Sequence, residues 1–208
     1  MHISEGVLSG PVLVAGAAVA LGGTVVGLKK LALDQVPQAG MLAAAFFVAS
    51  LIHVPVGPSS VHLILNGVVG LLLGWAAFPA IFTALLLQAM LFQYGGITTL
   101  GVNTVIMALP ALICYYLFSP FVLKSRRLAV PAAFACGAGA VFLGAVVAAT
   151  SLMFTESSFL ALAGLIVTAH LPVMAIEGVI TVFCVLFLRK VKPEMLAGHG
   201  DNKQMVLD

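Results

Sequence analysis

Charge is what this sequence lacks most. Only 8% of its 208 residues are Asp, Glu, Lys or Arg, whereas about 25% of a soluble globular domain is charged. Hydrophobic residues make up 62% of the chain, more than one compact soluble domain of this length can bury. We therefore predict an all-α integral membrane protein whose solvent is the lipid bilayer. The formal net charge of +2 is too small to indicate a nucleic-acid partner.

Two catalytic signatures are also missing. The sequence has no Gly-rich phosphate loop followed by Lys-Ser or Lys-Thr, so an ATPase that drives this protein has to be another chain. It has no HExxH motif either, which argues against a metal-dependent hydrolase within the membrane. We predict that the protein is not an enzyme.

Cysteine is scarce as well. Cys114, Cys136 and Cys184 lie far apart within apolar runs and form no CxxC pair. Such residues are typical of small hydrophobic side chains packed within helices. They therefore do not indicate the redox compartment.

Basic residues are absent from the start of the chain, and the first of them is Lys29. A signal peptide needs a positively charged beginning and a small-residue cleavage site, but this N-terminus carries Glu5 instead. The order favours an uncleaved first helix that leaves its N-terminus outside.

Seven apolar runs are candidates for membrane-spanning helices, and two of them are short. An α-helix that crosses a bilayer needs about 20 mostly apolar residues. The segments between the runs contain Gly, Pro, Asn or charged residues, as loops do. The predicted spans are residues 7–28, 40–56, 61–73, 78–92, 100–123, 129–153 and 159–188.

The basic residues test this count, because cytoplasmic loops carry the excess of Lys and Arg. With seven spans, the N-terminus outside and the C-terminus inside, all nine basic residues fall in inner loops or the tail. Six spans would break this alternation of inner loops with basic residues and outer loops without them. We predict a transmembrane domain over residues 1–192 and a short polar cytoplasmic tail over residues 193–208. The basic residues are Lys29, Lys30, Lys124, Arg126, Arg127, Arg189, Lys190, Lys192 and Lys203.

The chain begins MHISEG, with His2 directly behind Met1. The α-amine of Met1, the backbone nitrogen of His2 and the Nδ1 atom of its ring can close fused chelate rings on one metal ion. A second imidazole completes four nitrogens in a plane, which favours Cu(II) or Ni(II) and can also take Co(II). The alternative is a histidine that stands there by chance.

The segment SLIHVPVGPSSVHLILNG supplies the second imidazole on the same outer side as Met1. We expect His53 to end a helix and His62 to open the next element, so that either can reach the N-terminus. Asn66 lies four residues past His62, on the same face if the segment is helical, and the pair can then line one cavity. We favour His62 as the ligand and keep His53 as the runner-up.

Further polar residues are expected on the outer side. Glu5 either orients the N-terminal segment by accepting hydrogen bonds or is an exposed residue at a helix start. In the loop QYGGITTLGVN, Gly95 and Gly96 permit close backbone approach, and the two threonines can cap the next helix. Asn103, together with Gln88, is then a partner of the site rather than a ligand.

His170 and Glu177 stand seven residues apart, on one face of the last predicted span. A glutamate within the membrane usually has a partner, and we favour a structural, hydrogen-bonded role. The alternative is a proton relay through both residues. That relay would make the protein a proton-coupled secondary metal transporter or channel.

These motifs together resemble the CbiM/NikM family, the substrate-specific components of energy-coupling-factor transporters for cobalt and nickel. The opening MHISEGVLS is similar to the family's MHI-x-EG, YGGITTLGVN to its HGGLTTLGAN, and HLPVMAIEG to its last-helix pattern. The resemblance extends from Met1 to about Lys190. The chain departs from the family at Ser9, where Pro is frequent, at Tyr94, where the loop has His, and in SSVHLIL, where the family has SCSHPTG.

The resemblance implies that the Met1 amine, the backbone nitrogen and ring of His2, and His62 bind Co²⁺ or Ni²⁺ as the transported substrate, without a prosthetic group. It also implies a transmembrane coupling subunit, two cytoplasmic ATPase subunits and often a small accessory membrane subunit, with transported cobalt feeding cobalamin biosynthesis. The expected location is the inner membrane of a prokaryotic cell. We expect acid to weaken metal capture, because the amine and the imidazoles must lose protons to bind.

Overall fold

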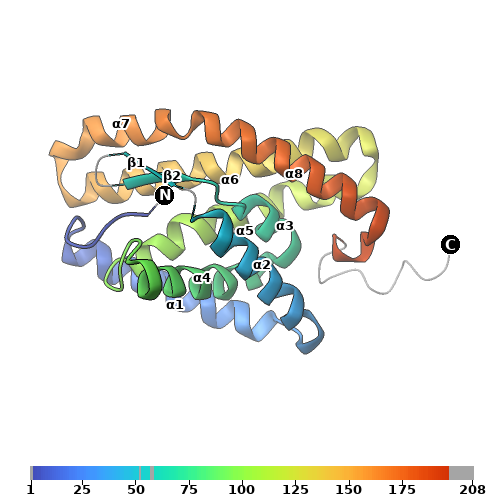
Figure 1. The fold of residues 1–208 in the computed structure, drawn as a ribbon, viewed down its shortest axis with the longest axis horizontal. Helices are drawn as coiled ribbons and strands as arrows, with labels where there is room; N and C mark the ends of the chain where they lie inside the picture. Colours follow the sequence, from blue (N-terminus) through green and yellow to red (C-terminus); the bar gives the residue numbers. More distant parts are fainter. Residues whose placement is uncertain (1, 52, 57–58, 197–208) are drawn as a thin grey trace.

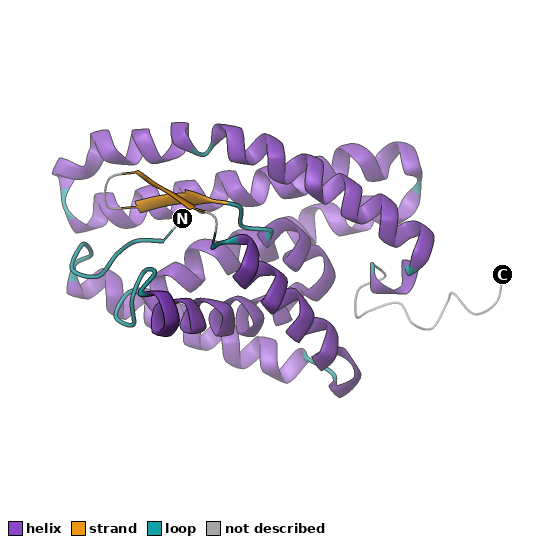
Figure 2. Ribbon diagram, in the orientation of Figure 1, coloured by secondary structure: helices purple, strands orange, loops and turns teal. Residues whose placement is uncertain are grey.

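The computed structural model describes residues 2–51, 53–56 and 59–196. Helices dominate this part of the chain, and its two strands pair only with each other (Figure 2). The α-helices are α1 (Gly10–Lys30), α2 (Val36–Ala49), α3 (Asn66–Leu73), α4 (Ala77–Phe92), α5 (Leu100–Lys124), α6 (Arg126–Thr155), α7 (Leu160–Ala169) and α8 (Leu171–Val191). The strands are β1 (His53–Val56) and β2 (Ser59–His62), and the 3₁₀ turns are η1 (Leu33–Gln35), η2 (Gly74–Ala76), η3 (Ser157–Phe159) and η4 (Pro193–Met195).

The long helices lie side by side (Figure 1). α7 and α8 follow one another along one edge, packed on α6, while α1 runs along the opposite edge against α4 and α5. Gly23 and Gly27 of α1 let Phe78, Pro79 and the Trp75 carbonyl approach closely. These two glycines therefore allow close packing of α1 within the chain.

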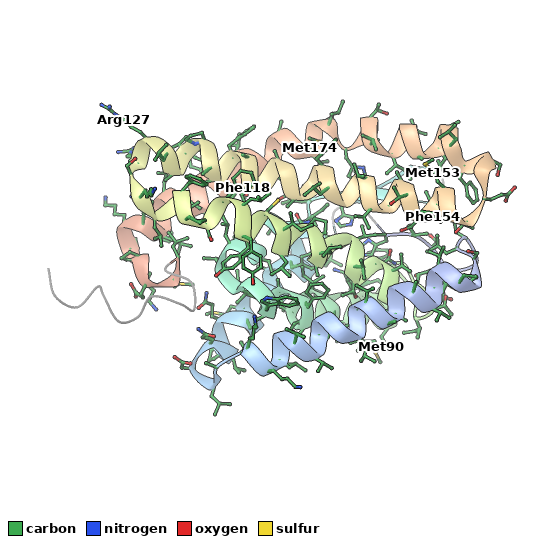
Figure 3. All side chains as sticks on the ribbon, turned by 180° about the vertical axis from the view of Figure 1, so that it is seen from behind. Met90, Phe118, Arg127, Met153, Phe154 and Met174 are labelled. Carbon is green, nitrogen blue, oxygen red and sulfur yellow. The ribbon has the colours of Figure 1, made fainter. Side chains whose placement is uncertain are left out.

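Large apolar side chains cover the outside of the helices, as the composition predicts for a protein in lipid. Phe154 is 83% exposed and Met90 66% exposed, and Figure 3 shows Arg127 at the far end of α6 from Phe154. Five segments of the described chain are long and apolar enough to cross a membrane: Gly10–Lys30, Asn66–Phe92, Leu100–Lys124, Arg126–Thr155 and Leu160–Val191. A multi-pass, mainly α-helical membrane protein is confirmed, whereas the count of seven spans and their orientation stay predictions.

The predicted second span is wrong at its end. The expected helix over residues 40–56 stops at Ala49, and β1 then pairs antiparallel with β2, with His53 opposite His62. His53 therefore does not end a helix. Pro55 explains the change, because proline lacks the N–H that a helix interior needs and is tolerated in an edge strand.

The predicted helical relation between His62 and Asn66 is also wrong. His62 is the last residue of β2, and α3 begins only at Asn66, after Leu65 in a left-handed conformation with φ +57° and ψ +14°. All eight residues of α3 are buried, and Gly74, with φ +51°, ends the helix. A short helix thus begins inside the protein, directly after the hairpin.

The last predicted span, residues 159–188, consists of two helices. α7 ends at Ala169 and α8 begins at Leu171, with Pro172 in its first turn. His170 lies between them and is fully buried. The predicted polar tail over residues 193–208 is described only as far as Leu196, so most of it lies outside the described residues.

Candidate metal site

The N-terminal segment lies within the bundle, next to the β1–β2 hairpin (Figure 1). His2 is 5% exposed and Ile3 is fully buried. Asn103 of α5 binds the backbone of Ile3 on both sides, because its Oδ1 accepts from the Ile3 N–H at 2.9 Å and its Nδ2 donates to the Ile3 carbonyl at 3.0 Å. A second bond from Nδ2 to the Thr99 hydroxyl, 3.2 Å long, orients the amide. Asn103 therefore fixes the main chain directly behind His2.

Glu5 holds the same segment from the outer loop. Its N–H donates to the Gly95 carbonyl at 3.0 Å, and its Oε1 accepts from the N–H and hydroxyl of Thr98 at 2.9 and 3.2 Å. These bonds from Thr98, the backbone bond first, lower the pKa of Glu5 below its usual range. The threonines do not cap α5 as predicted, since Thr99, its N-cap residue, makes no side-chain capping bond. The carboxylate of Glu5 takes that place at the positive end of the helix.

Gly96 provides a test of this contact. A Cβ atom at Gly96 would overlap the Glu5 side chain, and its φ of +130° is one that other residues rarely adopt. We expect Gly96→Ala to destabilise the fold by about 1–3 kcal/mol and to reduce metal retention. Gly22→Ala is the control, because Gly22 lies in α1 with open space around it, and alanine there should stabilise the helix by up to about 1 kcal/mol. Thermal unfolding in detergent measures both; equal melting temperatures for the two variants would contradict the contact.

The ring of His2 stacks on the ring of His62, with centroids 4.7 Å apart and planes inclined by 30°. Its Nε2 lies 2.8 Å from Oε1 of Gln88 in α4. An amide oxygen only accepts hydrogen bonds, so Nε2 carries the proton. The neutral ring then has its lone pair on Nδ1, the atom that can close a chelate ring with the backbone nitrogen of His2.

The orientation of the Gln88 amide follows from its other partners. Its Nε2 donates to the Phe47 carbonyl at 3.3 Å and to the hydroxyl of Ser50. Because a carbonyl cannot donate, the nitrogen must face α2, and the oxygen must face His2. Ser50, fully buried at the end of α2, in turn donates to the Phe46 or Phe47 carbonyl. Ser50 was not among the predicted site residues, although a serine at the end of an apolar run is a signal for a buried polar contact.

His62 presents the opposite nitrogen. Its Nδ1 lies 2.8 Å from the Leu63 carbonyl and therefore donates to it, which leaves the lone pair on Nε2. The ring is 3% exposed, and burial lowers the pKa of His62 well below its usual value. His62 is therefore neutral near pH 7, the state in which imidazole binds metals.

Asn66, His170 and Glu177 make their hydrogen bonds to backbone groups rather than to the two rings. The side chain of Asn66 donates to the Met107 and Ala140 carbonyls, in α5 and α6. His170 donates from Nδ1 to the Ile166 carbonyl at 2.7 Å, and Glu177 accepts from the backbone that follows His62. His53 pairs with His62 through the strand register, while Met1 lies outside the described residues.

Side chains alone do not form a metal cage in the described part of the chain. No group of three His, Cys, Asp or Glu side chains there is placed to hold an ion. Two imidazoles in contact, each hydrogen-bonded through one nitrogen, instead provide two aromatic nitrogen donors. A complete four-nitrogen site here needs main-chain nitrogen atoms as well.

Comparison with known proteins identifies the family of the chain. Residues 2–195 match the family CbiM, described as the cobalt uptake substrate-specific transmembrane region. The chain belongs to the CbiM family. Members of this family are membrane components of cobalt and nickel transport, so the ion is a substrate rather than a cofactor and the protein is a transporter component rather than an enzyme.

Individual relatives match most of this chain. A Haemophilus influenzae protein, named provisionally as a metal transport protein, is 45% identical over 94% of this chain and 97% of its own length. The fused nickel transport protein NikMN of Rhodobacter capsulatus is 34% identical over 95% of this chain and 64% of its own length. The crystal structure of a truncated transition metal transporter superposes with a TM-score of 0.80, at 27% identity, over 92% of this chain and 99% of that one.

Proposed function

We propose that this chain captures Co²⁺ or Ni²⁺ at the outer face of the membrane with four nitrogen ligands. They are the Met1 α-amine, the His2 backbone nitrogen, Nδ1 of His2 and Nε2 of His62. Asn103 and Glu5 hold the N-terminal segment in place, and Asn66 ties the start of α3 to α5 and α6. The supporting observation is the contact between the His2 and His62 rings, in which each ring keeps the lone pair that the chelate uses.

The spacing of the two rings agrees with this ligand set. In the planar chelate the backbone nitrogen of His2 lies between the amine and Nδ1. His62 takes the fourth position, opposite that backbone nitrogen, so its bond to the ion makes a right angle with the bond from Nδ1 of His2. With metal–nitrogen bonds of about 2 Å, each ring centroid lies about 3.1 Å from the ion, and the centroids of two such rings at a right angle are about 4.4 Å apart. The observed separation is 4.7 Å. The separation of the two rings is therefore compatible with binding to one ion.

Proton release tests the use of main-chain nitrogen. Binding removes the amide proton of His2 and whatever proton the amine carries, and the amine has a pKa of about 7.7–8.0. His62 releases no proton on binding, since burial holds its pKa well below its usual value. We expect between about one and two protons per Ni²⁺ at pH 7.5, falling toward about one at pH 9, measured by a pH indicator in weak buffer. Tight binding with no proton release at either pH would contradict the chelate.

Transport by this chain is proposed to depend on energy coupling through other subunits. The sequence has no phosphate loop, and the fused NikMN relative carries about a third of its length beyond the matched region. We propose a transmembrane coupling subunit, two cytoplasmic ATPase subunits and a small accessory membrane subunit, with cobalt destined for cobalamin biosynthesis. Seven spans, an outer N-terminus and an inner tail over residues 193–208 complete the proposed arrangement.

A proton relay along the last span has less support. In the described part of the chain, no hydrogen bond joins His170 to Glu177, and each binds a backbone group elsewhere. Glu177 is the more informative of the two, because its backbone partners belong to the segment that carries His62.

A further inference from the structure

Glu177 of α8 reaches the backbone directly behind the proposed ligand His62. Its side chain is fully buried, and its Oε1 accepts from two successive N–H groups, those of Ile64 and Leu65, the second at 2.7 Å. Its other oxygen, Oε2, has no hydrogen-bond partner among the described residues. All the hydrogen bonding of this carboxylate therefore goes to the segment between β2 and α3.

The backbone at this point forms an anion site. Leu65 is left-handed, with φ +57° and ψ +14°, and Asn66 begins α3. A side chain disfavours the left-handed conformation, but this conformation turns successive N–H groups toward one acceptor, as in an anion-binding nest. The carboxylate also lies at the positive end of α3, where a negative charge is favourable. Glu177 thus stabilises an otherwise unfavourable turn.

α8 is held firmly enough to place this carboxylate. A Cβ atom at Gly137 of α6 would overlap the backbone carbonyl of Glu177 and the Thr181 hydroxyl, so the two helices are in close contact at this point. Thr181 in turn donates to the Glu177 carbonyl at 2.7 Å. The packing of α6 on α8 therefore fixes the backbone from which the carboxylate projects, and the bonds from Ile64 and Leu65 fix the carboxylate itself.

The same turn determines where His62 points. Its Nδ1 donates to the carbonyl of Leu63, one residue before the first N–H that Glu177 binds. The far side of the turn is tied to α5 and α6 through Asn66. A shift of Ile64 or Leu65 would therefore move the Leu63 carbonyl and rotate the His62 ring away from His2.

We propose that Glu177 is a positioning residue for metal binding, which presents Nε2 of His62 to the ion by holding the Ile64–Leu65 turn. The inference rests on the proposed function, since it takes His62 as a ligand. It assigns to the glutamate of the last span a role in affinity rather than in proton transfer. Partners that orient a metal ligand without touching the ion typically change affinity 10–100-fold when they are removed.

A double-mutant cycle tests the role. Ni²⁺ affinity is measured in detergent for Glu177→Leu and Glu177→Gln, each alone and combined with His62→Ala. Glu156→Gln is the matched control, because Glu156 is an exposed glutamate at the end of α6. We expect a loss of about 100-fold for leucine, which accepts no hydrogen bond, about 10-fold for glutamine, which still accepts them, and no change for the control.

The combined variants decide between positioning and general support of the fold. If Glu177 acts through His62, its replacement should change the residual affinity of the His62→Ala protein by less than about threefold, because the effects of coupled residues do not add. Equal losses in both backgrounds, or no loss in either, would overturn the inference while leaving the chelate intact. If His62→Ala alone leaves the affinity unchanged, the inference about Glu177 and the proposed chelate are both wrong. If the leucine variant does not fold, the glutamine variant decides by the same comparison.

Discussion

Replacement of His2 by glutamine is expected to abolish metal uptake. The change removes the Nδ1 ligand and with it one of the two fused chelate rings, whereas Asn103 can still hold the Ile3 backbone. We expect the affinity for Ni²⁺ or Co²⁺ to fall by roughly a thousand-fold, equivalent to about 4 kcal/mol of binding free energy. Uptake of radioactive metal by cells that express the chain with its partners, and equilibrium binding by the purified protein, measure the loss.

Glutamine is the informative replacement because it keeps the second residue large. His2→Ala should lose uptake as well, but a small second residue also favours removal of Met1 and with it the proposed amine ligand. Ser4→Ala is a suitable control, since it alters the same N-terminal segment without touching a proposed ligand. Unchanged uptake by His2→Gln and His2→Ala would refute the chelate.

Replacement of His62 by alanine is the second large effect that we expect, and it separates the two histidines of the hairpin. The described ring of His62 contacts His2 and keeps its Nε2 lone pair. We expect His62→Ala to weaken Ni²⁺ binding by about 100-fold or more, about 3 kcal/mol, with three nitrogens of the N-terminus still holding the ion loosely.

His53→Ala is the matched control for that experiment. His53 pairs with His62 in the same hairpin, so the two variants perturb the same strands. We expect the His53 variant to keep its affinity within about threefold, less than 1 kcal/mol. The absorption bands of bound Ni²⁺ report the ligand set in both proteins. A larger loss from His53→Ala than from His62→Ala would transfer the ligand role to His53.

Much of the fold follows from composition, because lipid requires long apolar helices that satisfy their own backbone. α1, α4, α5 and α6 begin and end within a few residues of the predicted spans. The hairpin was missed because residues 51–56 continue the apolar run of the second predicted span, and apolarity alone does not distinguish a helix from a strand over a short run. Pro55 was the signal against a helix through this run.

The site was predictable in part. His2 stood out because a histidine next to the N-terminal amine is a chelating pattern, and Asn103 and Glu5 were expected near it. The hydrogen bonds that fix the His2 tautomer were not predictable, since Ser50 meets Gln88, the partner of His2, only through the packing of α2 on α4. The link from Glu177 to the Ile64–Leu65 turn spans more than a hundred residues, and no local pattern encodes it.

Metal content of the purified protein tests the central claim most directly. One sample keeps its native N-terminus, and the other carries two extra residues before Met1, which move the α-amine away and leave every side chain unchanged. Both are incubated with equal Ni²⁺ and Co²⁺, washed and assayed for bound metal. The account predicts about one ion per chain in the native form only, and the preferred ion identifies the substrate. Equal retention by both forms would contradict the proposal that the N-terminal amine is a ligand.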